Sequence, residues 1–283
     1  MRLANYAGRA TIVVDGRAVD VERASAGLLG SDPMLLASVG NHGALRDVAT
    51  AAAAGDWPEL DEARLGPPVP RPGKGLGVAL NYRKHAEETG RPAPDEPALF
   101  GKTDNCVCGP FDPIVVPDAC TSVDYEAELV IVFGRTCKAA RAADAWTYLA
   151  GVTVGQDISD RVEQRRPPVS QFTIAKSYDT FGPIGPYLVT TDELADPDAL
   201  PIECVVSGET LQSSNTDDLI FGVPALVEWI SRYITFQPGD LVWTGTPEGV
   251  GAARTPPRFL RPGDVVETTI AGVGTMRNPV VGG

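Results

Sequence analysis

Histidine is scarce in this 283-residue chain, which contains only two, His42 and His85. Chemistry that needs an imidazole must therefore use one of these two side chains. Basic residues are also in deficit, since 24 Lys and Arg stand against 37 Asp and Glu, for a net charge of −13. This deficit argues against nucleic acid or an anionic membrane as a partner, because both require a basic surface. A small anionic substrate needs only a local positive site, so the net charge does not exclude such a substrate.

Long apolar runs and ordered cysteine spacings are missing as well. No stretch approaches the roughly 20 apolar residues of a membrane span, and the first residues do not show the charged and then apolar pattern of a signal peptide. The five cysteines have an odd count and a scattered spacing, so they predict neither a disulfide framework nor a zinc site. We expect buried packing thiols in a reduced, cytoplasmic protein, with a nucleophilic cysteine as the less favoured alternative.

Short strand patterns separated by glycine and proline turns dominate what is present. Asp15-Gly16 between the apolar runs 11–14 and 17–21 is a strong hairpin signal. Further strands are expected at 75–80, 114–116, 129–133, 152–154, 187–189, 202–206, 241–243 and 265–270. Helices are expected at 33–54, broken near Gly40 and Gly43, and at 139–150 and 223–234. This pattern predicts a β-rich α+β fold, in the form of a barrel, roll or sandwich with peripheral helices.

A proline- and glycine-rich stretch at 65–74 divides the chain. It cannot hold a helix or a central strand, so we expect a boundary there. The prediction is a small N-terminal α+β domain at 1–72 and a catalytic domain at 73–283. His42 falls in the break of the first helix, and we expect it to be a surface or loop residue.

Glu126 and Glu128 stand two residues apart at the start of an apolar, β-branched run. Side chains at i and i+2 of a strand share a face, so both carboxylates would point the same way. Two close carboxylates are costly unless a cation lies between them, and a hard divalent ion with oxygen ligands fits that need. The alternative is a solvated strand end whose acids face water.

His85 and Glu88 follow the strand pattern at 75–80 and stand three residues apart. If the chain turns helical there, both side chains lie on one face. A carboxylate beside an imidazole orients the ring and raises its basicity, which would make a general base. An exposed polar turn is the alternative.

Two further charged residues are candidates for the same chemistry. Asp157, at the end of a predicted strand, is a candidate third oxygen ligand, and three carboxylates suit Mg²⁺ or Mn²⁺ better than Zn²⁺. The alternative interpretation of Asp157 is an acid that caps a helix or lies in a turn. Lys176 lies in an apolar and turn-rich context, where a sheltered ammonium would need an anionic partner, although an ordinary surface lysine is the simpler interpretation. The glycine-rich loop at 244–251 lacks the P-loop and dinucleotide-binding patterns.

Several motifs in a fixed order resemble the fumarylacetoacetate hydrolase family, from about residue 75 to the C-terminus. The motifs are Asn81-Tyr82-x-x-His85-x-x-Glu88, Asp124-Tyr125-Glu126-x-Glu128, Asp157-Ile158-Ser159-x-Arg161-x-x-Gln164, Lys176-Ser177-x-Asp179-Thr180-Phe181 and Thr244-Gly245-Thr246-Pro247-x-Gly249-Val250-Gly251. Leu99-Phe100-Gly101-Lys102 and Gly208-Glu209-x-x-Gln212-x-x-Asn215-Thr216 add support. Each motif is weak alone, whereas five in order are specific.

The resemblance implies a mixed β-sandwich roll, usually a homodimer, that binds Mg²⁺ or Mn²⁺ and a small 2-oxo acid. It implies metal ligands at Glu126, Glu128 and Asp157. It implies that His85 with Glu88 activates water and that Lys176 holds the substrate oxyanion. It further implies that Arg161, Gln164 and Thr246 contact the substrate.

The activity expected from the resemblance is metal-dependent hydrolysis of a carbon–carbon bond in a 2,4-dioxo acid of the acylpyruvate or fumarylpyruvate type. The alternatives use the same enolate: decarboxylation or tautomerisation of oxaloacetate, or isomerisation or hydration of an unsaturated 2-oxo acid. A metal-binding protein without catalysis is the alternative from another class. Phe172 and Ala175 replace a tryptophan and a glycine of many relatives near the expected substrate pocket, and Ser207 replaces a common asparagine.

Overall fold

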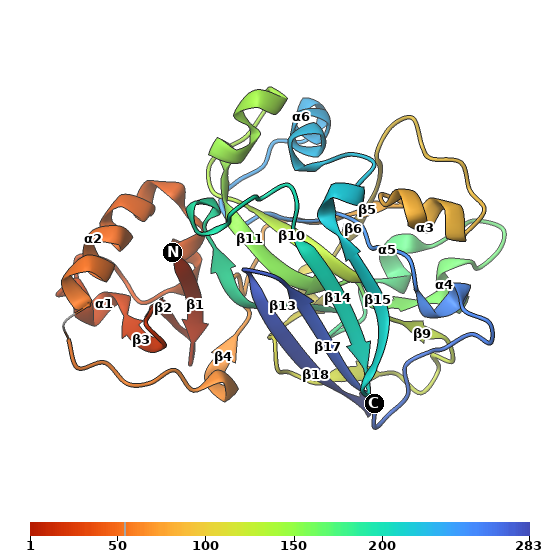
Figure 1. Ribbon diagram of the computed structural model, residues 1–283, viewed down its shortest axis with the longest axis horizontal. Coiled ribbons are helices and arrows are strands. Elements are labelled where there is room, and N and C mark those ends of the chain that lie inside the picture. The colour runs from red at the N-terminus through yellow and green to blue at the C-terminus, as the bar shows by residue number, and fades with distance from the viewer. Residues whose placement is uncertain (54) are drawn as a thin grey trace.

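Two open β-sheets form the body of the molecule, and short helices lie around them (Figure 1). The computed structural model describes residues 1–53 and 55–283. Within these residues one sheet has eleven strands, the other has five, and no barrel is closed. The predicted β-rich α+β class is therefore confirmed, as an open arrangement and not as a barrel.

The large sheet follows the order β3-β2-β1-β13-β11-β10-β16-β5-β6, and β4 and β7 attach to β1 and β13. Most neighbours are antiparallel, while β5 and β16 run parallel. Its strands are β1 Arg2–Tyr6, β2 Arg9–Val14, β3 Arg17–Asp20, β4 Leu65–Gly66, β5 Gly75–Ala79, β6 Ala98–Lys102, β7 Val107–Cys108, β10 Ala127–Phe133, β11 Leu149–Gln156, β13 Gly182–Val189 and β16 Leu241–Trp243.

The second sheet has the order β15-β14-β17-β18-β8, and β9 and β12 form a separate pair. These strands are β8 Ile114–Val116, β9 Val123–Asp124, β12 Ser159–Asp160, β14 Pro201–Val206, β15 Glu209–Asn215, β17 Val265–Ile270 and β18 Gly274–Gly282. The α-helices of the described residues are α1 Val21–Ala24, α2 His42–Ala52, α3 Arg83–Glu88, α4 Arg161–Gln164, α5 Phe172–Ala175 and α6 Val223–Tyr233. The 3₁₀ helices are η1 Pro33–Ala37, η2 Val39–Asn41, η3 Glu62–Arg64, η4 Asp104–Cys106, η5 Ala142–Tyr148, η6 Thr191–Glu193, η7 Thr216–Asp218 and η8 Gly251–Ala253.

Strand β10 lies between two hydrophobic cores. Its odd-numbered residues, such as Leu129 and Ile131, belong to one buried cluster, and Val130 and Val132 belong to the other. All seven residues of β10 are buried, because β11 and β16 pair with its edges and side chains cover both faces. Glu128 is therefore buried on a strand that is paired at both edges.

Two sequence predictions about helices are wrong. The helix expected at 139–150 is the 3₁₀ helix η5, and Leu149 already begins β11, because pairing with β10 and β13 overrides the alanine-rich local preference. His42 is buried and not in a surface loop, since it begins α2 and its Nε2 lies 3.0 Å from the Leu36 carbonyl oxygen. Residue 54, the predicted end of this first helix, lies outside the described residues.

The N-terminal segment continues the large sheet. Strand β1 pairs with β13 through Arg2 opposite Val189 and Leu3 opposite Leu188. Figure 1 shows α1 and α2 at one end of the molecule and α3 and α4 at the other. The division into domains at about residue 72 stays a prediction. Among the described helices none combines the length and the apolarity needed to cross a membrane.

Candidate active site

A cavity of about 370 Å³ lies where α3, α4 and α5 meet the large sheet. Eight of the nine predicted site residues line it: His85, Glu88, Glu126, Glu128, Arg161, Gln164, Lys176 and Thr246. The ninth, Asp157, is fully buried and reaches the cavity wall through its bond to Lys176. The fold thus collects residues from five separate motifs around one space.

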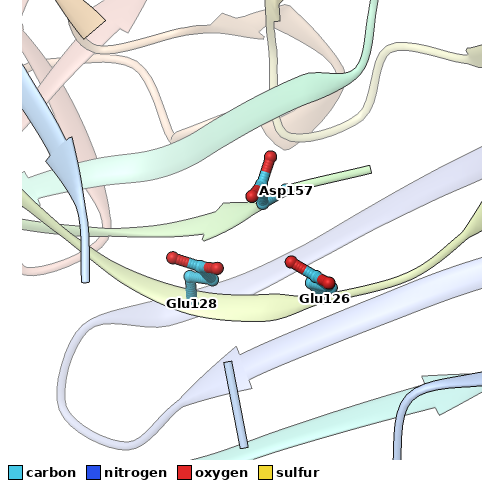
Figure 2. A group of neighbouring side chains, drawn as sticks. All are labelled: Glu126, Glu128 and Asp157. Carbon is cyan, nitrogen blue, oxygen red and sulfur yellow. The ribbon is translucent and has the colours of Figure 1, made fainter. Parts of the chain in front are cut away.

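Glu126, Glu128 and Asp157 form a buried acidic triad. Each offers one carboxylate oxygen, and these oxygens lie within 4.8 Å of one another. Figure 2 shows the three carboxylates around a shared space, with Glu128 on β10, Glu126 just before it and Asp157 from the neighbouring segment. The Asp157 backbone N–H donates to the Glu126 carbonyl at 2.9 Å, which continues the β10–β11 ladder and places Asp157 beside the two glutamates.

Two cationic side chains contact the triad from the cavity. Lys176 Nζ donates to Glu126 Oε2 at 2.7 Å, to Asp157 Oδ2 at 2.6 Å and to Ser159 Oγ at 2.7 Å. Arg161 Nη2 lies 2.6 Å from Glu126 Oε1. Burial raises the pKa of Glu126, but Lys176 and Arg161 outweigh it and hold that pKa at about 2. Lys176 is therefore no surface lysine, since its side chain is buried against two carboxylates.

Glu128 lacks such a partner. In the described part of the chain it forms no salt bridge, and its Oε2 accepts only the Gly245 backbone N–H, at 2.7 Å. Burial, together with the charges of Asp157 and Glu126, raises the pKa of Glu128 well above its ordinary value. A divalent cation among the three carboxylates would offset that cost with hard oxygen ligands. A buried acidic triad of this kind can bind a divalent metal ion.

The imidazole of His85 pairs with Glu88 across one turn of α3. His85 Nδ1 lies 3.1 Å from Glu88 Oε2, and the Gly249 backbone N–H donates to Glu88 Oε1 at 2.9 Å. Since a carboxylate accepts, this contact requires a proton on Nδ1, and in the neutral ring Nε2 is then the proton acceptor. The side chains of His85 and Glu88 are 12% and 23% exposed, and both line the cavity. They are therefore less exposed than the side chains of a freely solvated turn would be.

Buried hydrogen bonds position the three predicted substrate contacts. Arg161 Nε donates to Asp124 Oδ2 at 2.7 Å, and Arg161 Nη1 donates to Gln164 Oε1 at 2.9 Å. Thr246 Oγ1 donates to the Ala127 carbonyl at 3.0 Å and accepts from Gln212 Nε2 at 2.8 Å. These bonds hold polar side chains at fixed points of the cavity wall.

Three supporting residues received no role from the sequence. Lys102 is buried on β6, and its Nζ donates to Asp157 Oδ1 at 2.7 Å and to the Lys176 carbonyl at 2.6 Å. Asp124 accepts the Gly251 and Ala252 backbone N–H groups besides Arg161. Gln212 supports Thr246. Each belongs to a recognised motif, but only the tertiary contacts show what each side chain does.

Comparison with known proteins shows that this chain is similar to enzymes. The family model described as "Fumarylacetoacetate (FAA) hydrolase C-terminal" matches residues 74–281. The human protein "Oxaloacetate tautomerase FAHD2A, mitochondrial" is 43% identical over 236 residues, which are 83% of this chain and 75% of the relative.

Two solved structures superpose over the full length of the chain. Maleylpyruvate hydrolase from Sphingobium sp. SYK-6, in complex with manganese(II) and pyruvate, has a TM-score of 0.83 at 30% identity and covers 100% of both chains. The 5-carboxymethyl-2-hydroxymuconate delta-isomerase from Mycobacterium smegmatis has a TM-score of 0.78 at 33% identity, with the same coverage.

These comparisons bear on two expectations. The predicted cytoplasmic location is wrong, because the human relative and a bovine relative, 44% identical over 214 residues, are named as mitochondrial. Free thiols and an acidic composition report on redox chemistry and charge. Neither specifies the cellular location of a protein. The relatives also favour the alternative activities on a 2-oxo acid enolate over the hydrolysis that was first expected.

Proposed function

The chain is an enzyme that belongs to the fumarylacetoacetate hydrolase family, and from this membership we propose that it interconverts the keto and enol forms of oxaloacetate or a closely similar 2-oxo acid, with Mg²⁺ or Mn²⁺. The observation that supports the proposal most directly is the pairing of one base, His85, with a buried acidic triad and two cations in a single cavity. The oxaloacetate tautomerase at 43% identity supports the choice of substrate.

Tautomerisation needs a proton acceptor near carbon 3 of the substrate and positive charge near the oxygen on carbon 2. The C3–H bond breaks, its electrons form the C2–C3 double bond, and the electron pair of the carbonyl moves to oxygen, which then takes a proton. His85 Nε2, freed by the bond from Nδ1 to Glu88, is suited to accept the first proton. Lys176 and Arg161 are suited to stabilise the negative oxygen and the adjacent carboxylate.

The donor set is suited to a divalent ion at Glu126, Glu128 and Asp157, which would supply Lewis-acid stabilisation of the enolate. The bound manganese and pyruvate of the Sphingobium enzyme support a metal and a small 2-oxo acid in the same family. Oxygen ligands suit Mg²⁺ and Mn²⁺ alike, so we propose either ion.

Hydrolysis of an acylpyruvate is the second candidate. The full-length similarity to a maleylpyruvate hydrolase favours it, and the His85–Glu88 pair is suited to activate a water molecule. A direct assay separates the two: loss of enol absorbance from oxaloacetate without pyruvate release indicates tautomerisation, whereas pyruvate release from acetylpyruvate indicates hydrolysis. No change with either substrate, in the presence of Mg²⁺ or Mn²⁺, would contradict both proposals.

Replacing His85 by alanine should lower kcat by about 10²- to 10⁴-fold, because positioned general acid–base catalysis contributes that much. The KM should change far less, since the cations that hold the substrate remain in place. The matched control is His42→Gln, since His42 lies in α2 and does not line the cavity. Wild-type turnover by His85→Ala would show that the base has been assigned wrongly.

We also propose a homodimer, as the resemblance implies. Exposed apolar side chains near the cavity support the proposal, because Val162, Val169 and Ile174 are 58%, 64% and 56% exposed. Light scattering should give twice the chain mass of 29.8 kDa. A mass equal to a single chain at micromolar concentration would contradict the proposal.

A further inference from the structure

Two arginines at the mouth of the cavity have no part in the chemistry described so far. Arg91 follows the end of α3, and Arg165 is the C-terminal cap of α4, so the two reach the cavity from different elements. Both are exposed, in contrast to the buried Arg161 and Lys176. The cavity therefore has a buried set of charges at its inner end and a second, cationic set at its rim.

Neither rim arginine is neutralised by a residue that the structure describes. Among the described residues, the side chains of Arg91 and Arg165 form no hydrogen bond, ion pair or stacking contact. The next residue, Arg166, differs, since its Nη1 lies 3.2 Å from Glu163 Oε1. In a chain with a net charge of −13, two unpaired guanidinium groups at one opening are a local exception. A guanidinium presents a planar pair of donors that matches a carboxylate.

The buried cations at the inner end of the cavity can pair with the charged groups at only one end of a substrate. Arg161 and Lys176 lie beside the acidic triad, where the carboxylate and 2-oxo group of a 2-oxo acid would bind under the proposed function. The lining of the cavity also includes the apolar side chains of Phe100, Phe172 and Val250. A second carboxylate on the substrate cannot be stabilised by these walls, because an unpaired charge against apolar groups is costly.

We infer that Arg91 and Arg165 recognise a second carboxylate, which makes the enzyme selective for 2-oxo diacids over 2-oxo monoacids. This inference rests on the proposed function for the orientation of the substrate and deepens it by naming the residues that would select a diacid. The rim arginines are specificity residues: they contact the end of the substrate that does not react. Because they are exposed, salt weakens their attraction to the ligand more than that of the buried cations.

Oxaloacetate and 2-oxobutyrate test the inference, because the second compound has a methyl group in place of the distal carboxylate. Titration calorimetry of the intact protein with Mg²⁺ should show tighter binding of oxaloacetate at low salt. Arg91→Gln and Arg165→Gln should each weaken oxaloacetate binding about tenfold, and the double variant more, since one charged hydrogen bond contributes about that factor. Their effect on 2-oxobutyrate should stay within twofold. Arg166→Gln is the matched control, and neither affinity should change.

The outcomes separate this inference from the proposed function. If both rim variants weaken the two ligands equally, or neither ligand, the selectivity inference is wrong. If oxaloacetate binds with the expected dependence on Arg91 and Arg165 but its enol is not consumed, the inference stands and the proposed tautomerase activity fails. Raising the salt from 50 mM to 500 mM should reduce the preference for oxaloacetate, and a preference that does not depend on salt would contradict a role for exposed arginines.

Discussion

Replacing Glu128 by glutamine is expected to abolish metal-dependent turnover, with kcat/KM lowered by at least about 10³-fold. The reason is that Lewis-acid stabilisation of an enolate is worth several kcal/mol, and Glu128 is the triad member without a salt bridge among the described residues. Glutamine has nearly the same shape and can still accept the Gly245 N–H. The metal-free variant should therefore be at least as stable as the wild type, because a costly buried carboxyl is removed.

Thermal unfolding with and without Mn²⁺ measures this directly. The wild type should gain a higher Tm with Mn²⁺, since a ligand that binds only the folded state stabilises it. The Glu128→Gln variant should gain little or nothing. Glu209→Gln is the matched control, because Glu209 is 61% exposed on β15 and forms a surface pair with Arg254. An undiminished Mn²⁺ shift in Glu128→Gln would remove this residue from the metal site.

Replacing Lys176 by methionine is expected to damage both stability and activity. Its ammonium contacts Glu126, Asp157 and Ser159, so its loss leaves two buried carboxylates without that partner. Removing one member of a buried ion pair costs about 3–5 kcal/mol of unfolding free energy. Activity should fall by about 10³-fold as well, because positive charge next to the developing oxyanion is lost.

The two effects of Lys176→Met should respond differently to metal. Mn²⁺ should restore much of the lost stability, because it neutralises the buried carboxylates that have lost Lys176, while kcat should stay low. Urea unfolding with and without Mn²⁺ and steady-state kinetics measure the two effects. Lys138→Met is the matched control: Lys138 is exposed and donates to two carbonyls at the end of α6, so its loss should cost about 1 kcal/mol or less. A stable, active Lys176→Met variant would contradict the assigned role.

The sequence predicted which residues meet around the cavity better than it predicted their interactions. Glu126 and Glu128 share a face because strands have a period of two, and His85 and Glu88 meet because α3 places positions three apart on one side. Lys102 shows the limit of such reasoning. It stands 55 residues before Asp157 in the chain and 74 before Lys176, and no local period relates it to either.

The same limit explains the errors in the fold. The alanine-rich stretch at 139–150 has a helical preference, but Leu149 onward forms the strand between β10 and β13, where two neighbours satisfy its backbone. The glycines near His42 predict a surface position, yet the side chain is buried in the fold. Burial depends on what packs against a residue, and the local sequence does not contain that information.

By itself the sequence determined the β-rich class, the residues suited to metal and proton chemistry, and the net negative charge, because composition, strand period and helix period are local properties. The tertiary structure alone decided that Lys102 and Asp124 support Asp157 and Arg161. Within residues 1–53 and 55–283, it also decided that Glu128 is the triad carboxylate without a salt bridge and that the side chains of Arg91 and Arg165 are unpaired at the same opening. These facts are distances between residues far apart in the chain, and they arise only when strands and helices pack together.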